Sequence, residues 1–316
     1  MRGTKQTLLS NLYDNVIIKN MHLNLSNIKQ KVSLLLVFSL LLFSCTERID
    51  IDTKNAEPRL SVFGYITDKV GSHSIKITYT AGFFTTEPSR GISNAKVTIS
   101  DGLNEYMLTE NTDSVGMGLY QTDSNFFGIA DTTYTLNISL DFDNDGNDER
   151  YQATAYMPFP TRVDSVALES SIMPTFPNLL LYGYVPENQE NYLAVSIRKN
   201  KQVQNILDYL MILPDAYFEG NDIDGYAFPC FVNDGIELGD TVIFRVNSLS
   251  QEFADFLSHA NSEIGGSNPI FGGPPADVFT NIRALDENNK TEIAGFFGAF
   301  GWDEKFTISE EDYKNN

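Results

Sequence analysis

The sequence predicts a mainly β protein with two domains: an N-terminal immunoglobulin-like or transthyretin-like sandwich, followed by a second β-rich domain with one amphipathic helix. In residues 58–160, apolar residues recur at every second position, as in half-buried strands. Turn residues such as Asp101-Gly102 separate these runs, as in hairpins. The 272 residues from position 45 onward exceed the roughly 100 to 200 residues of one domain, which predicts two.

The N-terminal segment, residues 1–44, resembles a secretion signal that ends in a lipobox. Lys29 and Lys31 precede a short apolar run, residues 32–43, and Cys45 follows it. The run is too short for the ~20 apolar residues of a spanning helix, and a basic region before it is typical of exported proteins. We expect the segment to be removed and the Cys45 thiol to carry a diacylglyceryl group. The alternative is a short membrane anchor or a buried helix that happens to end in cysteine.

Charge argues against nucleic acid as a partner. The formal net charge is −20, and it becomes −24 without residues 1–44, which hold five basic residues and one acidic residue. The mature charge of −24 is the same whether translation starts at Met1 or at Met21, because residues 1–44 are removed in both cases. Phosphate groups and anionic lipids repel such a chain, because their recognition relies on clustered Lys and Arg. Acidity is also common in soluble exported proteins, so it names no partner.

Cysteine usage excludes an intramolecular disulfide in the mature chain. There are two cysteines, and lipidation uses Cys45, which leaves Cys230 without a partner. Cys230 stands between Pro229 and Phe231 in an apolar run. We expect it to be a small buried hydrophobic residue and not a nucleophile.

A polar tether, residues 45–57, begins with Cys45. The first folded block, residues 58–160, follows it. Tyr134 opens its strand after a turn, like the corner tyrosine of immunoglobulin-like sandwiches. The segments with strand-like alternation are residues 60–66, 75–79, 95–99, 106–109, 118–122, 134–140 and 151–157.

The second block is residues 161–316, because Pro158-Phe159-Pro160 interrupts any strand ladder. Residues 248–264 are expected to form the helix, with Ser248 and Gln251 as its capping box. Gly265-Gly266 would end it, and a Gly/Pro-rich loop over residues 265–277 follows, without the lysine of a phosphate-binding loop. The expected strands are residues 163–168, 179–185, 192–198, 241–246 and 293–301, with a less regular stretch over residues 204–231.

One acidic stretch has part of a calcium-loop pattern. Asp141, Asp143 and Asp145, with Gly146, occupy positions 1, 3, 5 and 6 of an EF-hand-type loop. Position 12 is Gln152 in place of a bidentate glutamate, and strands are expected on both sides in place of helices. The sequence leaves two interpretations open: weak calcium binding, or an acidic hairpin turn. A second acidic stretch, residues 221–225, is expected to be a solvated loop.

The sequence contains no recognisable catalytic set. Of the mature chain's histidines, His73 falls in a strand or turn and His259 on the polar side of the helix, and no HExxH or GxSxG motif exists. A glycosidase-type carboxylate pair stays open, because sequence spacing does not give the separation of two carboxylates in space. We therefore expect a protein that is not an enzyme.

Several segments carry a resemblance to a known family. The chain resembles the Bacteroidota lipoprotein family called domain of unknown function 4249, over nearly all of the mature sequence. This resemblance implies an outer-membrane, surface-exposed lipoprotein of unknown function that is commonly associated with TonB-dependent transporters, and it transfers no catalytic residue. Besides the lipobox Cys45, the segments that carry it are EPRLSVFGYITD (57–68), ISNAKVTISDG (92–102), GLYQTDS (118–124), NPIFGGPPADVFTNI (268–282) and GFFGAFG (295–301).

The leading functional hypothesis is a lipid-tethered binding or accessory module at the outer membrane, acting with a TonB-dependent transporter. A surface hydrolase with an unrecognised carboxylate pair, or a structural or adhesion lipoprotein, is the alternative. The sequence does not identify the ligand or the oligomeric state. Aromatic residues of the second domain are candidate ligand contacts, although such residues more often belong to a core: Phe271, Phe296, Phe297, Phe300 and Trp302.

Overall fold

The computed structural model shows a mainly β protein, and residues 55–316 form one compact unit. The signal segment, Cys45, the tether, Phe271 and most of the Gly/Pro-rich loop lie outside the described residues. The residues that the structure describes are 58–80, 89–112, 118–143, 145–172, 176–187, 192–200, 211–214, 218, 222–230, 235–265, 278–286, 289 and 291–310.

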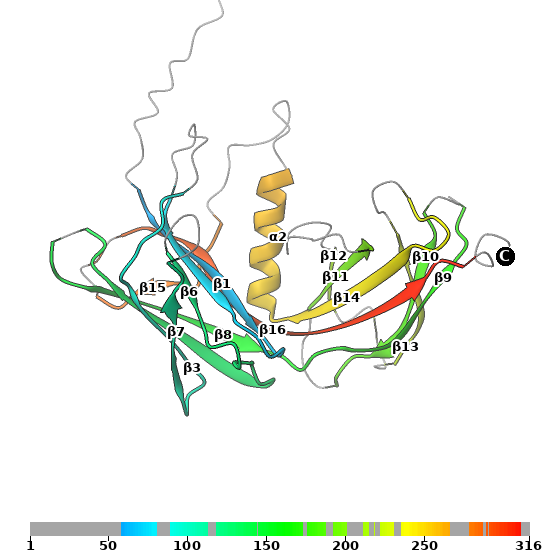
Figure 1. Ribbon diagram of the computed structural model, residues 1–316, viewed down its shortest axis with the longest axis horizontal. Helices are drawn as coiled ribbons and strands as arrows, with labels where there is room; N and C mark the ends of the chain where they lie inside the picture. Colours follow the sequence, from blue (N-terminus) through cyan, green and yellow to red (C-terminus); the bar gives the residue numbers. More distant parts are fainter. Residues whose placement is uncertain are drawn as a thin grey trace, which may run out of the picture. The chain divides into compact units, whose positions relative to one another are not determined.

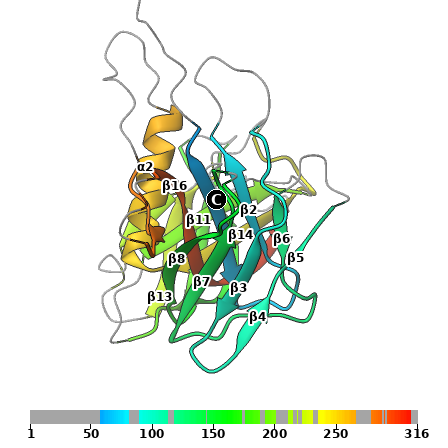
Figure 2. The ribbon, with the colours of Figure 1, turned by 90° about the vertical axis from the view of Figure 1, so that its left-hand side faces the viewer.

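The described strands form three sheets of eight, five and three strands. The eight-stranded sheet has the order β12 (Met211–Pro214), β11 (Tyr192–Lys199), β14 (Thr241–Leu249), β16 (Ile293–Ile308), β1 (Leu60–Thr67), β2 (Ser74–Tyr79), β6 (Leu119–Gln121) and β5 (Thr109–Glu110). The five-stranded sheet has the order β15 (Arg283–Ala284), β8 (Glu149–Met157), β7 (Thr132–Leu140), β3 (Lys96–Ser100) and β4 (Glu105–Met107). Figure 2 labels its strands β8, β7, β3 and β4. The three-stranded sheet has the order β13 (Asp222–Pro229), β10 (Asn178–Tyr184) and β9 (Arg162–Glu169).

Strand β16 joins the two halves of the chain into the eight-stranded sheet. Its first half pairs in parallel with β1, from Leu60 opposite Ile293 to Thr67 opposite Phe300. Its second half then pairs antiparallel with β14, from Gly301 onward. The strand is therefore longer than the predicted residues 293–301. The division into domains at residue 160 stays a prediction, but strands from both sides of that position share one sheet (Figure 1).

One face of this sheet is covered by the two smaller sheets, and each pair of sheets encloses a core. On β1, Leu60, Val62 and Ile66 face the five-stranded sheet and are fully buried, as the period of two predicts. On β14, Val242 and Phe244 are also fully buried, in the cluster shared with the three-stranded sheet.

The helix starts later than the sequence predicted, and Ser248 is not its cap. Strand β14 continues to Leu249, so Ser248 pairs with Gly301, and its Oγ accepts a hydrogen bond from the backbone N–H of Thr161 at 2.7 Å. Helix α2 spans Gln251–Gly265. Its N-cap is Ser250, whose Oγ accepts from the N–H of Phe253 at 3.4 Å. Sheet pairing therefore takes precedence over the capping-box pattern at this position.

Helix α2 packs on the other face of the eight-stranded sheet (Figure 1). Phe253 is fully buried, and its ring stacks on Phe296 and Phe300 of β16 at centroid distances of 5.5 and 5.9 Å. Within the described part of the chain, no helix combines the length and the apolar character that crossing a bilayer requires. The contacts of Phe253 with β16 place the apolar stripe of α2 in a core between the helix and the sheet.

Two further local predictions were tested. Residues 222–225, expected in an acidic loop, lie in β13, where Asp222, Ile223 and Asp224 pair with β10. Ile223 is buried between the exposed Asp222 and Asp224, so this acidic segment is the alternating face of a strand. The Tyr134 hydroxyl accepts a hydrogen bond from the N–H of Ile129 at 2.6 Å, which is the contact that a corner tyrosine makes.

Candidate ligand-binding pocket

A pocket of about 330 Å³ opens on the face of the eight-stranded sheet that also carries α2. Its wall comes from β1, the turn between β1 and β2, β11, β14 and β16, which are far apart in the sequence but adjacent in the sheet. Its volume lies at the lower end of the roughly 300–1,000 Å³ of ligand pockets. The lining residues that define its chemistry are Tyr65, Lys69, Arg198, Arg245, Phe300 and Trp302.

Strand register brings the polar lining residues together. Arg245 of β14 lies directly opposite Ser196 of β11 on one side and Glu304 of β16 on the other. Directly opposite residues share a face of a sheet, because side chains alternate with a period of two. Asn247 and Trp302 form the next row in the same way. The neighbouring positions of β14 point to the covered face, so one strand supplies both a core and a pocket wall.

Two arginines converge on one carboxylate beside the pocket. The Nε and Nη2 of Arg245 each lie 2.8 Å from Oε2 of Glu304, and Nη2 of Arg198 donates to the same oxygen. The Arg245 guanidinium also lies over the Trp302 ring, 3.9 Å from its centroid. Lys69 reaches the same ring at 4.9 Å. The indole is therefore surrounded by positive charge, in a favourable cation–π geometry.

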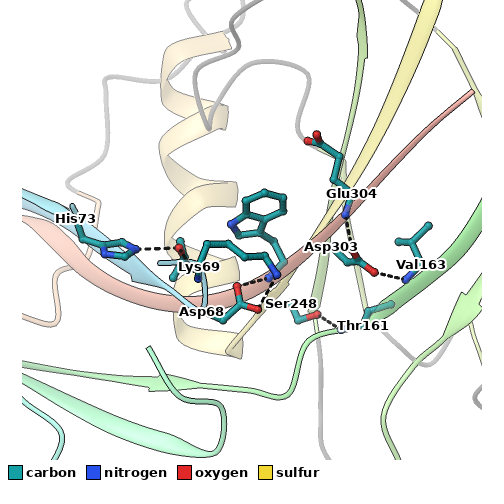
Figure 3. Close-up of polar contacts among 10 residues, drawn as sticks. Asp68, Lys69, His73, Thr161, Val163, Ser248, Asp303 and Glu304 are labelled. Carbon is teal, nitrogen blue, oxygen red and sulfur yellow. Dashed lines mark hydrogen bonds and ion pairs between the residues drawn. The ribbon is translucent and has the colours of Figure 1, made fainter. Parts of the chain in front are cut away.

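The turn between β1 and β2 is fastened to β16 by Asp68. Its Oδ1 accepts from the backbone N–H of Trp302 at 3.1 Å, and its Oδ2 accepts from Nζ of Lys69 at 3.0 Å (Figure 3). His73, at the other side of the turn, is hydrogen-bonded through Nε2 to Oγ1 of Thr67 at 2.9 Å. These contacts fix Lys69 and His73 at the rim of the pocket.

Neighbouring residues of β16 point to opposite sides of the sheet (Figure 3). Asp303 points to the covered face, where its Oδ2 accepts from the N–H of Val163 at 2.9 Å. Glu304 points to the pocket face and binds the two arginines. One carboxylate thus anchors the chain connection after Pro160, and the next neutralises part of the pocket charge.

Burial changes the pKa of two pocket residues. Burial raises the pKa of the Tyr65 hydroxyl, and the positive charge of Arg245 acts in the opposite direction. Burial lowers the pKa of His73. A hydrogen bond with the backbone of Gly71 and the negative charge of Asp68 act in the opposite direction and raise it, but burial has the larger effect. Both effects of burial favour the neutral form, so the positive charges of the pocket come from Lys69, Arg198 and Arg245.

The predicted aromatic contacts divide between core and pocket. Phe296 and Phe297 are buried at 2% and 0% exposure, on opposite faces of β16, and are core residues as the alternative interpretation stated. Phe300 is 3% exposed but borders the pocket, and Trp302 is half-buried in its wall. Phe271 lies outside the described residues.

The predicted calcium residues lie in the hairpin turn between β7 and β8. Asp145 donates its backbone N–H to Oδ1 of Asp141 at 3.0 Å and to Oδ1 of Asp143 at 3.1 Å. Ligand atoms of Asp141, Asp143 and Glu149 lie within 4.8 Å of one another, whereas Asp145 is not in this group. Glu149 faces the start of the turn, because it pairs with Leu140 across the hairpin. The turn is thus a hairpin turn with a carboxylate cluster, and calcium binding stays a prediction.

Cys230 and the two histidines of the mature sequence lie at separate places in the fold. Cys230 is fully buried, and burial raises the pKa of its thiol to about 12, which keeps it protonated and confirms it as a buried hydrophobic residue. His259 is exposed on α2, with its ring against Phe279 at 5.6 Å. It lies on a different element from His73, which is held by Thr67.

Sequence reasoning missed the arginines and the lysine of the pocket. Arg198 ends an alternating strand, and Arg245 stands between the apolar Phe244 and Val246, which is also the pattern of an ordinary solvated strand face. The alternation gives the face but not the neighbouring strand. A cluster of cations on one face could have been found only with the sheet order known.

Comparison with known proteins gives one family. No curated protein matches the chain. The family model described as Domain of unknown function (DUF4249) matches residues 46–305. All the residues that line the pocket lie within this range. This match extends over most of the sequence, and the chain belongs to the DUF4249 family.

Proposed function

We propose that this protein is a lipid-anchored binding module of the outer membrane that captures a small ligand in the pocket beside α2 and acts with a TonB-dependent transporter. The observation that carries the proposal is the pocket itself: cationic, aromatic and hydroxyl side chains from five segments converge in one place. Ligand sites combine apolar walls with a few placed polar groups in this way. The lipobox before Cys45 supports the location at the membrane.

The pocket favours binding over hydrolysis. Its nearest carboxylates, Asp68 and Glu304, are both engaged by cationic side chains. A carboxylate pair for hydrolysis would instead need one protonated and one free carboxyl group facing the substrate. Capture without turnover is therefore the function that the geometry supports best.

We also propose an immunoglobulin-like or transthyretin-like identity for the N-terminal sandwich. The contact between Tyr134 and Ile129 supports it. This half would then act as the support that holds β1 and Lys69 against the pocket.

Copurification tests the partner. Gentle detergent extraction of the tagged full chain should recover a TonB-dependent transporter in stoichiometric amount. Recovery of the protein alone would count against an accessory role. Lys305→Gln, at an exposed residue of β16 outside the pocket, is the tagged control and should copurify like the wild type.

The Cys45→Ala variant tests the anchor. It should fold normally and appear in the soluble fraction, because the variant has no thiol to acylate. Membrane fractionation followed by a salt wash is the measurement. A variant that stays in the membrane pellet after the wash would contradict lipid anchoring.

A further inference from the structure

The geometry points to a small acidic, hydroxylated ligand, of about the size of one monosaccharide, whose oxyanion group binds Arg198, Arg245 and Lys69. This inference rests on the proposed function, because it assumes that the pocket is the binding site, and it adds the chemical class of the ligand. The shared chemistry is a carboxylate, sulfate or phosphate group on a compact polar body.

The pocket has a local excess of positive charge. The chain as a whole carries −20, yet three cationic side chains gather at this pocket against two carboxylates, Asp68 and Glu304. A local excess of positive charge on an acidic protein does not serve solubility, and it raises the local concentration of anions. A neutral ligand would accept hydrogen bonds from these groups but would lack the stronger attraction between opposite charges.

The arginines of the pocket have N–H donors that a ligand could use. A guanidinium group has five N–H donors in a planar fork that fits carboxylate, sulfate and phosphate groups. Both arginines are bound to the same oxygen of Glu304. The Nε of Arg198 is buried and has no hydrogen-bond partner among the described residues. A buried donor without a partner is costly, and an oxyanion in the pocket would supply the acceptor.

The remaining lining residues fit a hydroxylated body. Ser196 offers a hydroxyl group, and Asn247 donates one amide N–H to the carbonyl of Ala194 at 3.2 Å, so that its Oδ1 can accept from a ligand. Tyr65 and Phe300, with ring centroids 5.1 Å apart, add an apolar surface beside Trp302. A sugar ring has hydroxyl groups at its edge and apolar C–H groups on its faces, which matches both kinds of wall.

Trp302 makes the inference directly measurable, because it is the single tryptophan of the chain. An anion bound to Arg245 and Lys69 would weaken the field of these two cations on the indole, so the fluorescence of Trp302 should shift on binding. The full chain in detergent would be titrated with glucuronate, glucose 6-sulfate, glucose 6-phosphate and glucose. We expect at least one acidic probe to bind roughly tenfold more tightly than glucose, as charge-assisted hydrogen bonds predict.

Two variants assign the effect to the pocket. Arg198→Gln should weaken the acidic probe roughly tenfold and leave glucose binding unchanged. Lys69→Gln should act in the same direction, and because Lys69 is 44% exposed in a turn, this variant keeps the test valid if Arg198→Gln does not fold. Lys305→Gln, exposed on the same strand as Trp302, is the matched control and should bind like the wild type.

The outcomes separate the two proposals. Preference for an acidic probe that both variants abolish supports the inference, and the preferred probe distinguishes carboxylate from sulfate and phosphate. Equal binding of glucose and the acidic probes would overturn the acidic ligand but keep the pocket as a binding site. An acidic preference that survives in both variants would overturn the assignment to this pocket. No response to any probe would overturn the inference, and copurification with a transporter would still test the accessory role by itself.

Discussion

The two faces of the eight-stranded sheet differ in what they are built to do, although the same strands form both. The covered face is apolar, and Leu60, Val62 and Phe297 are fully buried there. The pocket face, beyond the area that α2 covers, carries Arg245, Glu304 and Trp302, all only partly buried. Because side chains alternate, the odd residues of β16 around position 300 face the covered side of the sheet, and the even ones face α2 and the pocket.

This difference separates stability from binding. Burial of the covered face provides the hydrophobic free energy that holds the sheets together. The ion pairs of the pocket face are partly exposed, and such pairs add at most about 1 kcal/mol each to stability. We infer that the charged pocket residues, unlike Phe300, add little to stability and can serve a ligand.

The largest expected effect contrasts two phenylalanines of β16. Phe297→Ala removes a fully buried ring from the core between the eight-stranded and five-stranded sheets. It should lower the free energy of unfolding by about 3–5 kcal/mol. Phe306→Ala, at a side chain that is 66% exposed, should change it by less than about 0.5 kcal/mol. Chemical denaturation followed by circular dichroism measures both. Similar losses in the two variants would mean that the faces are not energetically distinct.

An intermediate effect contrasts two serines at the end of β14. Ser248→Ala should cost about 1–3 kcal/mol, because the buried N–H of Thr161 loses its acceptor. Ser250→Ala removes the N-cap of α2 on the other face and should cost about 1 kcal/mol. Thermal unfolding of both variants gives the order. A larger loss for Ser250 would show that the helix end matters more than the link across the covered face.

The smallest effect concerns pH at the pocket rim. The folded pKa of His73 is lowered below 6.5 by burial, so its contribution to stability is present above pH 6.5 and is lost as the pH falls through the folded pKa. Denaturation midpoints measured at about pH 7 and about pH 5 should therefore fall less in His73→Gln than in the wild type. His259→Gln, at an exposed helix position, is the control. If the denaturation midpoint fell equally between the two pH values in the wild type and in His73→Gln, the fold would not hold His73 in the neutral form.

Most of the strands, the alternating core and the family could be predicted from the sequence alone. Period-two alternation is a local property, so residues 60–66, 134–140 and 151–157 were found within one or two residues of β1, β7 and β8. The place of Cys230 in an apolar run, between Pro229 and Phe231, predicted its burial correctly. These features depend on near neighbours in the chain.

The role of Ser248 and the existence of the pocket depend on which strands become neighbours in the sheet. The capping-box pattern at Ser248 was equally valid locally, but pairing with Gly301 across the sheet kept it in β14. Arg198, Arg245 and Lys69 come from three separate parts of the chain, and each by itself looks like a solvated charge. Which strands become neighbours is set by the burial of distant apolar faces against each other, and local periodicity carries no information about that choice.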